Sequence, residues 1–302
     1  MKEAEALLSG PASNAANLFT DMQMAELEEK IKADILQAID SDKLVLPTLP
    51  EVALQVREVA ESPDSSVQDL AKVISNDTAM TARIIRVCNS PLLRGSREIS
   101  NLTMAIGRLG MAYTANLATG LAMEQMFQAT SEQVDQRMRE IWRNSTEVAG
   151  ICHVLAQHYT KLKPDQATLA GLVHQIGALP VLTYIEHHDI HVDNETLDKL
   201  IETLQPTIGE YILKKWDFPA ELQIVPTEFS NFHREAPSVD YADVVMVAKL
   251  QSLIGSKHPY TEMDWGQISA FNRLGLDPEI DMNEAEDLSA EMEAAMALLS
   301  PS

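Results

Sequence analysis

The chain has 302 residues and carries 45 acidic against 23 basic side chains, so its formal net charge at pH 7 is -22. That charge disfavours a sequence-independent grip on nucleic acid or on an anionic membrane, since both of those surfaces are negative themselves. Aromatic residues make up only 5% of the chain, while methionine is plentiful and glycine is scarce. This balance favours helices packed through aliphatic side chains over a β-sandwich, and we expect an all-α protein.

Cysteine usage and the N-terminal sequence bear on the compartment. Cys88 and Cys152 lie in apolar helical contexts without a CxxC or zinc spacing, so we interpret them as small core residues, a usage typical of the cytosol. Residues 1–19 lack the basic-then-apolar order of a signal peptide, and no apolar run approaches ~18 residues. We expect a cytoplasmic protein that does not span a membrane.

The first part of the chain is expected to contain a tail and then short, capped helices. Residues 1–43 form the tail and one amphipathic surface helix, in which Ile31, Ile35 and Ile39 step by four. The main domain is expected to span 44–255. Its early helices are predicted to begin at capping residues, namely Ser65 or Ser66, Asp77, and Asn101 or Thr103.

Longer helices are expected in the second half of the main domain. One runs over 111–127, a long one over 132–160, and the last over 239–255. Pro206 is predicted to begin a new helix in its first turn, and Pro226 to bend or break one.

Residues 256–302 are expected to form an acidic, helical C-terminal extension. From Gly275 to the end there are eight acidic residues and no basic one. The final helix has an apolar stripe that packs either on its own domain or on a partner, and the sequence leaves both open; the stripe consists of Leu288, Met292, Met296 and Leu299.

The segment 165–186 holds the histidine with the most plausible chemical role, His174, in the middle of an apolar helical run. Gly171 and Gly177 flank it, which predicts close approach of another backbone or of a ligand, because glycine costs a helix roughly 1 kcal/mol relative to alanine. Pro180 is expected to kink or restart the helix.

Three blocks elsewhere in the chain strengthen a family interpretation: LPTLPEV, NDTAMTARIIRVCNSPLLRG and ISNLTMAIGRLG. With the His174 helix, they resemble in order and spacing the HDOD domain, the HD-related output domain of bacterial signalling proteins. The resemblance covers roughly 44–255 and implies an HD-like multi-helix bundle. It also implies a degenerate relative of the HD-superfamily phosphohydrolases, whose His-Asp pair, with a first histidine and a late aspartate, holds a divalent metal.

This chain departs from that ligand set at three positions. The resemblance places Asn144 at the first histidine, Gln175 at the aspartate after His174, and Lys249 at the late aspartate. A neutral amide is a poor ligand for a hard cation, and an ammonium repels one. Asp243, six residues before Lys249, offers an alternative register for the late aspartate. We therefore expect a vestigial pocket without metal, in which Lys249 stands in for the lost ion beside His174, Gln175 and Glu228.

Two other histidine groups are weaker candidates for metal binding. His187, His188 and His191, with Asp189, are expected at a helix end, where the dipole and solvent accommodate them. His153 and His158 lie five residues apart, a poor spacing for shared ligation, and are expected to be structural.

An arginine cluster is the one basic stretch of this acidic chain, with a single glutamate among five arginines between positions 79 and 123. It consists of Arg83, Arg86, Arg94, Arg97 and Arg108. These side chains either pair with carboxylates of the same chain or dock an acidic protein or phosphorylated ligand, for which the guanidinium fork is suited.

We expect a non-enzymatic signalling module that acts through protein–protein contact and needs no cofactor. The resemblance implies a partner such as a sensor kinase, a response regulator or a cyclic-dinucleotide enzyme, with no nucleic acid and no membrane. Two alternatives stay open: a divalent-metal phosphohydrolase acting on a nucleotide, and a small-ligand sensor that uses the vacated pocket.

Overall fold

Every regular element in the described part of the chain is a helix, which confirms the all-α prediction. The computed structural model describes residues 21–41, 50–90, 93, 98–278, 288, 291, 292 and 295. In chain order the helices are α2 (Asp21–Asp40), α3 (Glu51–Glu61), α4 (Val67–Ile74), α5 (Thr78–Cys88), α6 (Leu102–Leu109), α7 (Met111–Met123), η1 (Glu124–Met126), α8 (Glu132–Tyr159), α9 (Pro164–Val173), α10 (Ala178–His187), α11 (Asn194–Lys215), α12 (Ala220–Gln223), α13 (Val225–Glu228), α14 (Tyr241–Ser252), η2 (Pro259–Glu262), η3 (Trp265–Gln267) and α15 (Ser269–Leu274).

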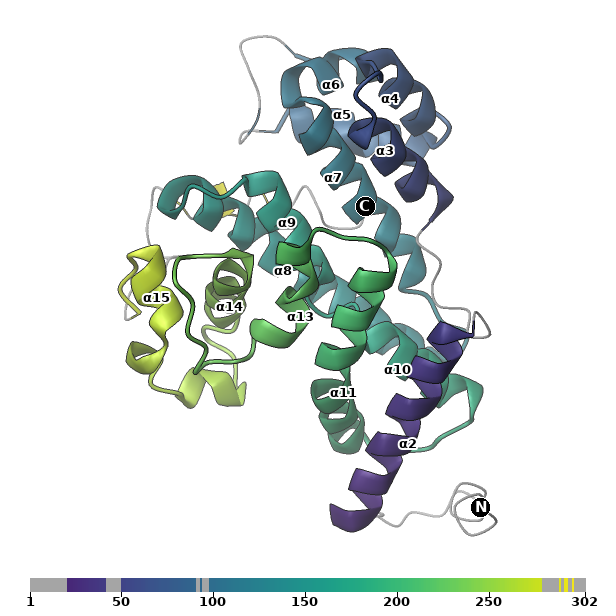
Figure 1. The fold of residues 1–302 in the computed structure, drawn as a ribbon, viewed down its shortest axis with the longest axis vertical. Coiled ribbons are helices and arrows are strands. Elements are labelled where there is room, and N and C mark those ends of the chain that lie inside the picture. The colour runs from purple at the N-terminus through teal and green to yellow at the C-terminus, as the bar shows by residue number, and fades with distance from the viewer. Residues whose placement is uncertain are drawn as a thin grey trace.

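Helices α3 to α7 form the upper group in Figure 1, and the predicted caps lie at the starts of α4, α5 and α6. The Ser66 side chain and Asp69 form a capping box, while Asp77 and Asn101 each accept the backbone N–H three residues on. The predictions for these starts are confirmed, with Ser66 and Asn101 chosen from their alternatives. Gly110, at φ +87°, then separates α6 from α7 in a backbone conformation that suits glycine.

Helix α8 and helix α9 pack along each other at the centre of the molecule, and glycine allows the close contact. A Cβ on Gly171 would lie 2.5 Å from Cα of Ala149, and one on Gly177 would lie 2.1 Å from the carbonyl oxygen of Gln205. The predicted close approach at both glycines is confirmed, and the approaching group is backbone or the atoms next to it.

The His174 segment is two helices and not one kinked helix. The break falls at residues 174–177, before Pro180, which lies in the first turn of α10. Taken together, Pro164–His187 is long and apolar enough to cross a membrane by composition, contrary to the sequence expectation. In this fold 89% of its apolar window is buried, so it is the core of the bundle.

Pro206 does not begin a helix, because α11 runs through it as one helix of 22 residues. Pro226 lies in the first turn of the four-residue helix α13, directly after α12, so the predicted break in that region is confirmed. Pro226 lies where α13 packs against α11, because a Cβ on Gly209 of α11 would lie 2.8 Å from Cβ of Pro226.

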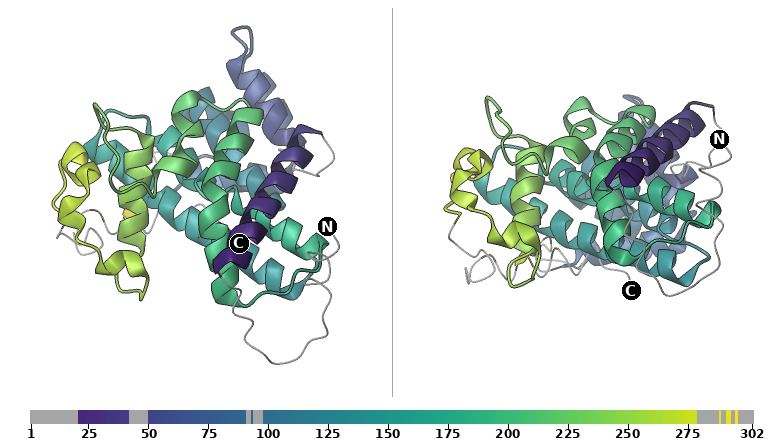
Figure 2. Two further views of the ribbon diagram at one scale, coloured as in Figure 1. Left: turned by 60° about the horizontal axis from the view of Figure 1, so that its bottom comes forward. Right: turned by 90° about the horizontal axis from the view of Figure 1, so that it is seen from below.

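Helix α2 crosses α10 and α11 (Figures 1 and 2). Its apolar stripe, Ile31, Ile35 and Ile39, is buried, and the Tyr184 hydroxyl donates to Asp34 at 2.6 Å. The amphipathic helix predicted before residue 43 is therefore confirmed.

Parts of the C-terminal extension lie on the main bundle. Helix α15 packs beside α14 (Figure 1). Met292 and Ala295 are buried, and Glu291 lies 2.7 Å from His158 of α8. The final stripe thus packs on its own chain at the positions described, while Met296 and Leu299 fall outside the described residues.

Candidate functional site

His174 is fully buried at the C-terminal end of α9. Its Nδ1 lies 2.6 Å from the carbonyl oxygen of Gly171. Because a carbonyl only accepts, Nδ1 carries the proton and Nε2 is left with its lone pair. Nε2 has no hydrogen-bond partner among the described residues, and the Phe229 ring packs edge-on against the imidazole at 4.9 Å between centroids. Burial, and then the charge of Lys249, lower the pKa of His174 to about 3, so the ring is neutral.

Lys249, on α14, supplies the positive charge next to this imidazole. Burial lowers the pKa of Lys249, and the negative charge of Glu147 on α8 opposes that shift. Burial likewise raises the pKa of Glu147, while Lys249 and Arg143 lower it. The site is therefore a partly buried electrostatic group of one cation, one carboxylate and one neutral imidazole.

Glu147 was not predicted from the sequence. The signal that could have found it is its spacing, three residues after Asn144, which places both on one face of α8. Burial and then the charge of Lys249 lower the pKa of His258, which belongs to the extension. The negative charges of Glu202 and Asp198 oppose this shift. The extension thus contributes to the surroundings of the site.

The other predicted pocket residues are placed less centrally. Gln175 is half-buried in the turn between α9 and α10, and Asn144 is exposed on α8. Glu228 does not serve Lys249, because its carboxylate lies 3.1 Å from Nε of Arg234. The charge of Lys249 acts on His174, and Glu147, not Glu228, is the carboxylate whose charge acts on Lys249.

The alternative aspartate, Asp243, is fully buried and already bound. Both its oxygens accept from Arg273, at 2.7 Å each, and it also forms an ion pair with Arg234. Its backbone N–H in turn completes a capping box with Asp240 at the start of α14. A carboxylate held by two guanidinium groups is not available to a metal ion.

The residues at the His174 site do not fit a divalent metal. The site offers one imidazole whose Nε2 has no partner among the described residues, but by the family resemblance Gln175 replaces the carboxylate ligand and the exposed Asn144 replaces the first histidine, and the Lys249 ammonium adds a repelling charge. Among the described residues, the donors that a hard cation needs are therefore missing at this site, and no metal-dependent step follows from this geometry.

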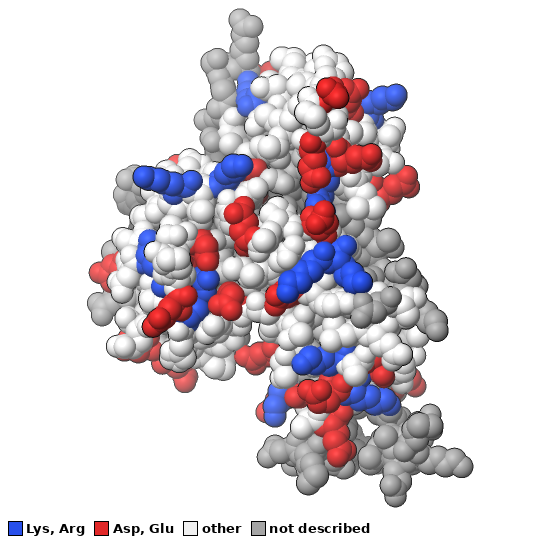
Figure 3. Space-filling view, in the orientation of Figure 1, with Lys and Arg blue, Asp and Glu red and all other residues white. Residues whose placement is uncertain are grey.

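The arginine cluster is divided in the structure. Arg83 forms an ion pair with Glu124 of η1, and Arg108 is half-buried near the carbonyl of Cys88. Arg86 is exposed on α5. Arg94 and Arg97 lie outside the described residues. On the face of the molecule drawn in Figure 3, Lys and Arg lie in small groups among Asp and Glu and do not form one broad basic surface.

The remaining histidines have local partners. His188 caps the end of α10, stacks on Tyr184 and lies within 2.9 Å of that residue's carbonyl oxygen. His153 is buried, with Nδ1 3.1 Å from the Thr168 hydroxyl. His187 and His191 lie at and beyond the end of α10, as predicted from the sequence.

Comparison with known proteins identifies the family. A sequence model of the HDOD domain matches residues 46–230, which is more than half of the chain. The chain therefore belongs to the HDOD domain family, and the family prediction is confirmed.

Solved structures with this fold include several bacterial proteins. A candidate metal-dependent phosphohydrolase from Shewanella amazonensis SB2B is 34% identical, with 90% of this chain and 99% of that chain covered and a TM-score of 0.79. An HDOD domain protein of unknown function from Geobacter sulfurreducens is 20% identical, with 91% and 100% covered and a TM-score of 0.61. A candidate signal transduction protein from Marinobacter aquaeolei VT8 is 21% identical, with 94% and 67% covered and a TM-score of 0.61. The last two show the fold alone.

A curated relative, an uncharacterized protein of Treponema pallidum (strain Nichols), is 21% identical over 264 residues, or 80% of this chain. The match covers 48% of that relative, so the chain spans about half of its length.

Proposed function

We propose that this protein is a non-catalytic regulatory module of bacterial signalling that works through protein–protein contact. The observation that carries the proposal is a buried, neutral His174 on which the positive charge of Lys249 acts, at a position where the resemblance to the HD-superfamily hydrolases places a metal ligand. Gln175 supports it, since its amide replaces the charged ligand of the His-Asp pair. A cytoplasmic location and a partner such as a sensor kinase, response regulator or cyclic-dinucleotide enzyme belong to the same proposal.

The test combines metal content with activity. Purified protein is expected to hold no stoichiometric manganese, iron or magnesium and to hydrolyse no nucleotide in a panel supplied with these metals. Metal-dependent hydrolysis that His174→Ala abolishes would overturn the proposal. Affinity capture from the native cell, followed by mass spectrometry, is expected to recover a signalling protein.

A phosphohydrolase is the second candidate, because the 34% identical Shewanella protein is named as one. Metal-dependent hydrolysis that His174→Ala abolishes would favour this candidate over the regulatory module. A small-ligand sensor is the third, favoured by the buried Nε2 of His174 that lacks a partner among the described residues. A thermal shift with one compound of a nucleotide panel, lost in His174→Asn, would identify that function.

A further inference from the structure

The first half of α8 exposes a regular stripe of polar side chains. Glu132, Gln136, Arg139 and Arg143 are all exposed, and their spacing of four, three and four residues places them on one face of the helix. The stripe is acidic at its N-terminal end and basic at its C-terminal end. When α8 of a second copy runs antiparallel to this one, the acidic end of each stripe faces the basic end of the other.

The stripe forms one wall of a groove of about 540 Å³ between α8 and the segment that follows α7. Phe127 and Trp142 also line it, with their ring centroids 5.0 Å apart. The buried indole N–H of Trp142 has no acceptor among the described residues. The groove therefore combines an apolar base with a charged wall, which is the composition of an interface core and its rim.

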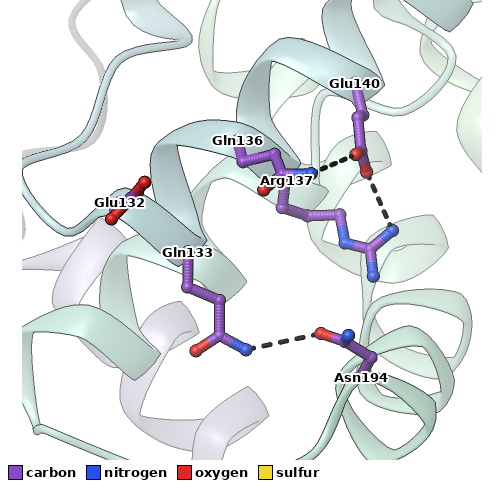
Figure 4. Close-up of a pocket in the computed structure, with 6 residues that line it drawn as sticks. All are labelled: Glu132, Gln133, Gln136, Arg137, Glu140 and Asn194. Carbon is purple, nitrogen blue, oxygen red and sulfur yellow. Dashed lines mark hydrogen bonds and ion pairs between the residues drawn. The ribbon is translucent and has the colours of Figure 1, made fainter.

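A second groove, of about 550 Å³, lies on the other side of the same helix, between α8 and the start of α11 (Figure 4). There the side chains are bonded to one another: Gln133 to Asn194, and Gln136 and Arg137 to Glu140. Figure 4 shows Glu132 apart from these bonds. The first half of α8 is thus a ridge with a groove on each side, a shape that can interlock with a copy of itself.

Most charges on this ridge already have partners within the chain. Arg139 binds Asp135 at 2.6 Å, and Arg137 binds Glu140 at 3.1 Å. Within the described part of the chain, Glu132 and Arg143 have no ion pair, although the charge of Arg143 acts on Glu147 and lowers its pKa. They are 11 residues apart on one helix, roughly 16 Å, and so cannot reach each other within one chain.

We propose that this ridge is a self-association surface, on which α8 of a second copy lies antiparallel across a two-fold axis near the middle of the stripe. Glu132 of each copy then meets Arg143 of the other, and Gln136 meets Arg139. A two-fold interface makes each contact twice, so a single substitution removes two ion pairs. Since each copy carries a net charge of -22, a contact between copies needs this local complementarity to offset the overall repulsion.

The test is a charge swap in the full chain, measured by analytical ultracentrifugation over a range of protein concentrations. Glu132→Arg and Arg143→Glu are each expected to weaken dimerisation at least tenfold, because each places like charges opposite one another twice. The double variant is expected to restore it to within about threefold of wild type, and added salt is expected to weaken the wild-type dimer. Circular dichroism checks that each variant is folded.

Glu29→Arg is the matched control for Glu132→Arg, because it makes the same change of net charge at an exposed position of α2. That change lowers the overall repulsion and is expected to leave dimerisation unchanged or slightly stronger. A protein that stays monomeric at every concentration, or a dimer that the single variants leave intact, would overturn the inference. So would a double variant as weak as the singles. None of these results depends on whether the His174 site is catalytic.

Discussion

Arg273 of α15 binds Asp243 of α14 through two parallel hydrogen bonds, from Nε and Nη2 to the two carboxylate oxygens, each 2.7 Å long. Asp243 is fully buried, and Arg234 forms an ion pair with it as well. The Ser269 hydroxyl completes the arrangement by donating to the carbonyl of Arg234. The extension after residue 255 is therefore bonded to the last helix of the main domain.

Removing this guanidinium should destabilise the whole fold. In Arg273→Met the buried Asp243 keeps only one of its two cations, so we expect a loss of about 2–3 kcal/mol in the free energy of unfolding. Urea denaturation measures it. Lys214→Met, which breaks an exposed ion pair on α11, is the control and should cost less than about 0.5 kcal/mol. Equal midpoints for the two variants would show that the bond between Arg273 and Asp243 contributes nothing to the stability of the fold.

Arg57 connects the upper helical group, α3 to α7, to the C-terminal end of helix α11. From α3 it donates to the carbonyls of Trp216 and Asp217, at 2.7 and 2.6 Å, where α11 ends, and its guanidinium lies 4.7 Å from the Phe218 ring centre. A cation at a helix C-terminus is favourable there, and the planar fork suits two acceptors. We expect Arg57→Ala to cost about 2 kcal/mol.

Arg57→Lys separates fork geometry from charge. It retains the charge but not the paired hydrogen bonds, and is expected to recover less than half of the lost stability. Hydrogen exchange at the end of α11 should quicken in both variants. Unaltered exchange would mean that the Arg57 contact does not stabilise the packing of α3 on the end of α11.

The sequence predicted the elements whose signals are local. The caps at Ser66, Asp77 and Asn101 depend on one side chain and a backbone N–H three residues away, so spacing alone identifies them. Pro206 was misplaced because a proline inside a helix is tolerated only when tertiary packing supports the helix, and the packing of α11 against α10 and α13 involves residues distant in sequence.

The candidate site was predictable only in part, for a related reason. The resemblance to the family assigned His174 and Lys249 to the site. A family motif gives the positions of the metal ligands, however, and does not predict which residues surround a ligand that has been replaced. Glu147 on α8 and His258 in the extension are distant from Lys249 in sequence, yet the charge of Lys249 shifts the pKa of both. Glu228 was expected to be the partner of Lys249, but its carboxylate forms an ion pair with Arg234. Nothing local in the sequence indicates that pair.

His174 should make stability depend on pH in a defined direction. Its pKa is about 3 in the folded protein against 6.5 when exposed, so below pH 6.5 only the unfolded chain takes up this proton. Stability is therefore complete above pH 6.5 and declines as the pH falls toward 3, by about 2 kcal/mol between pH 7.5 and pH 5. Urea midpoints at these two pH values measure the decline.

His174→Asn is the matched control, because its amide can still donate to the Gly171 carbonyl but does not titrate. Its stability should change less than that of wild type over the same range. Lys249→Met should also reduce the wild-type dependence, since it removes a positive charge that opposes protonation of the ring. It should in addition cost about 1 kcal/mol at pH 7, because Glu147 loses its counter-charge. Parallel pH curves for wild type and His174→Asn would contradict the buried neutral imidazole.

The arginine cluster gives a final prediction, because its two best-placed members are in different situations. Arg83 is paired with Glu124, whereas Arg86 is exposed on the same helix. Arg83→Glu should therefore lower stability by about 1–2 kcal/mol, since it places two carboxylates together in a half-buried position. Arg86→Glu should leave stability within about 0.5 kcal/mol but weaken binding of an acidic partner, and added salt should weaken the wild-type complex in the same way. Affinity for the partner recovered by capture from the native cell measures the second effect, and denaturation the first. If Arg86→Glu binds as tightly as wild type at low and high salt, the exposed part of the cluster is a solvated surface and the partner docks elsewhere.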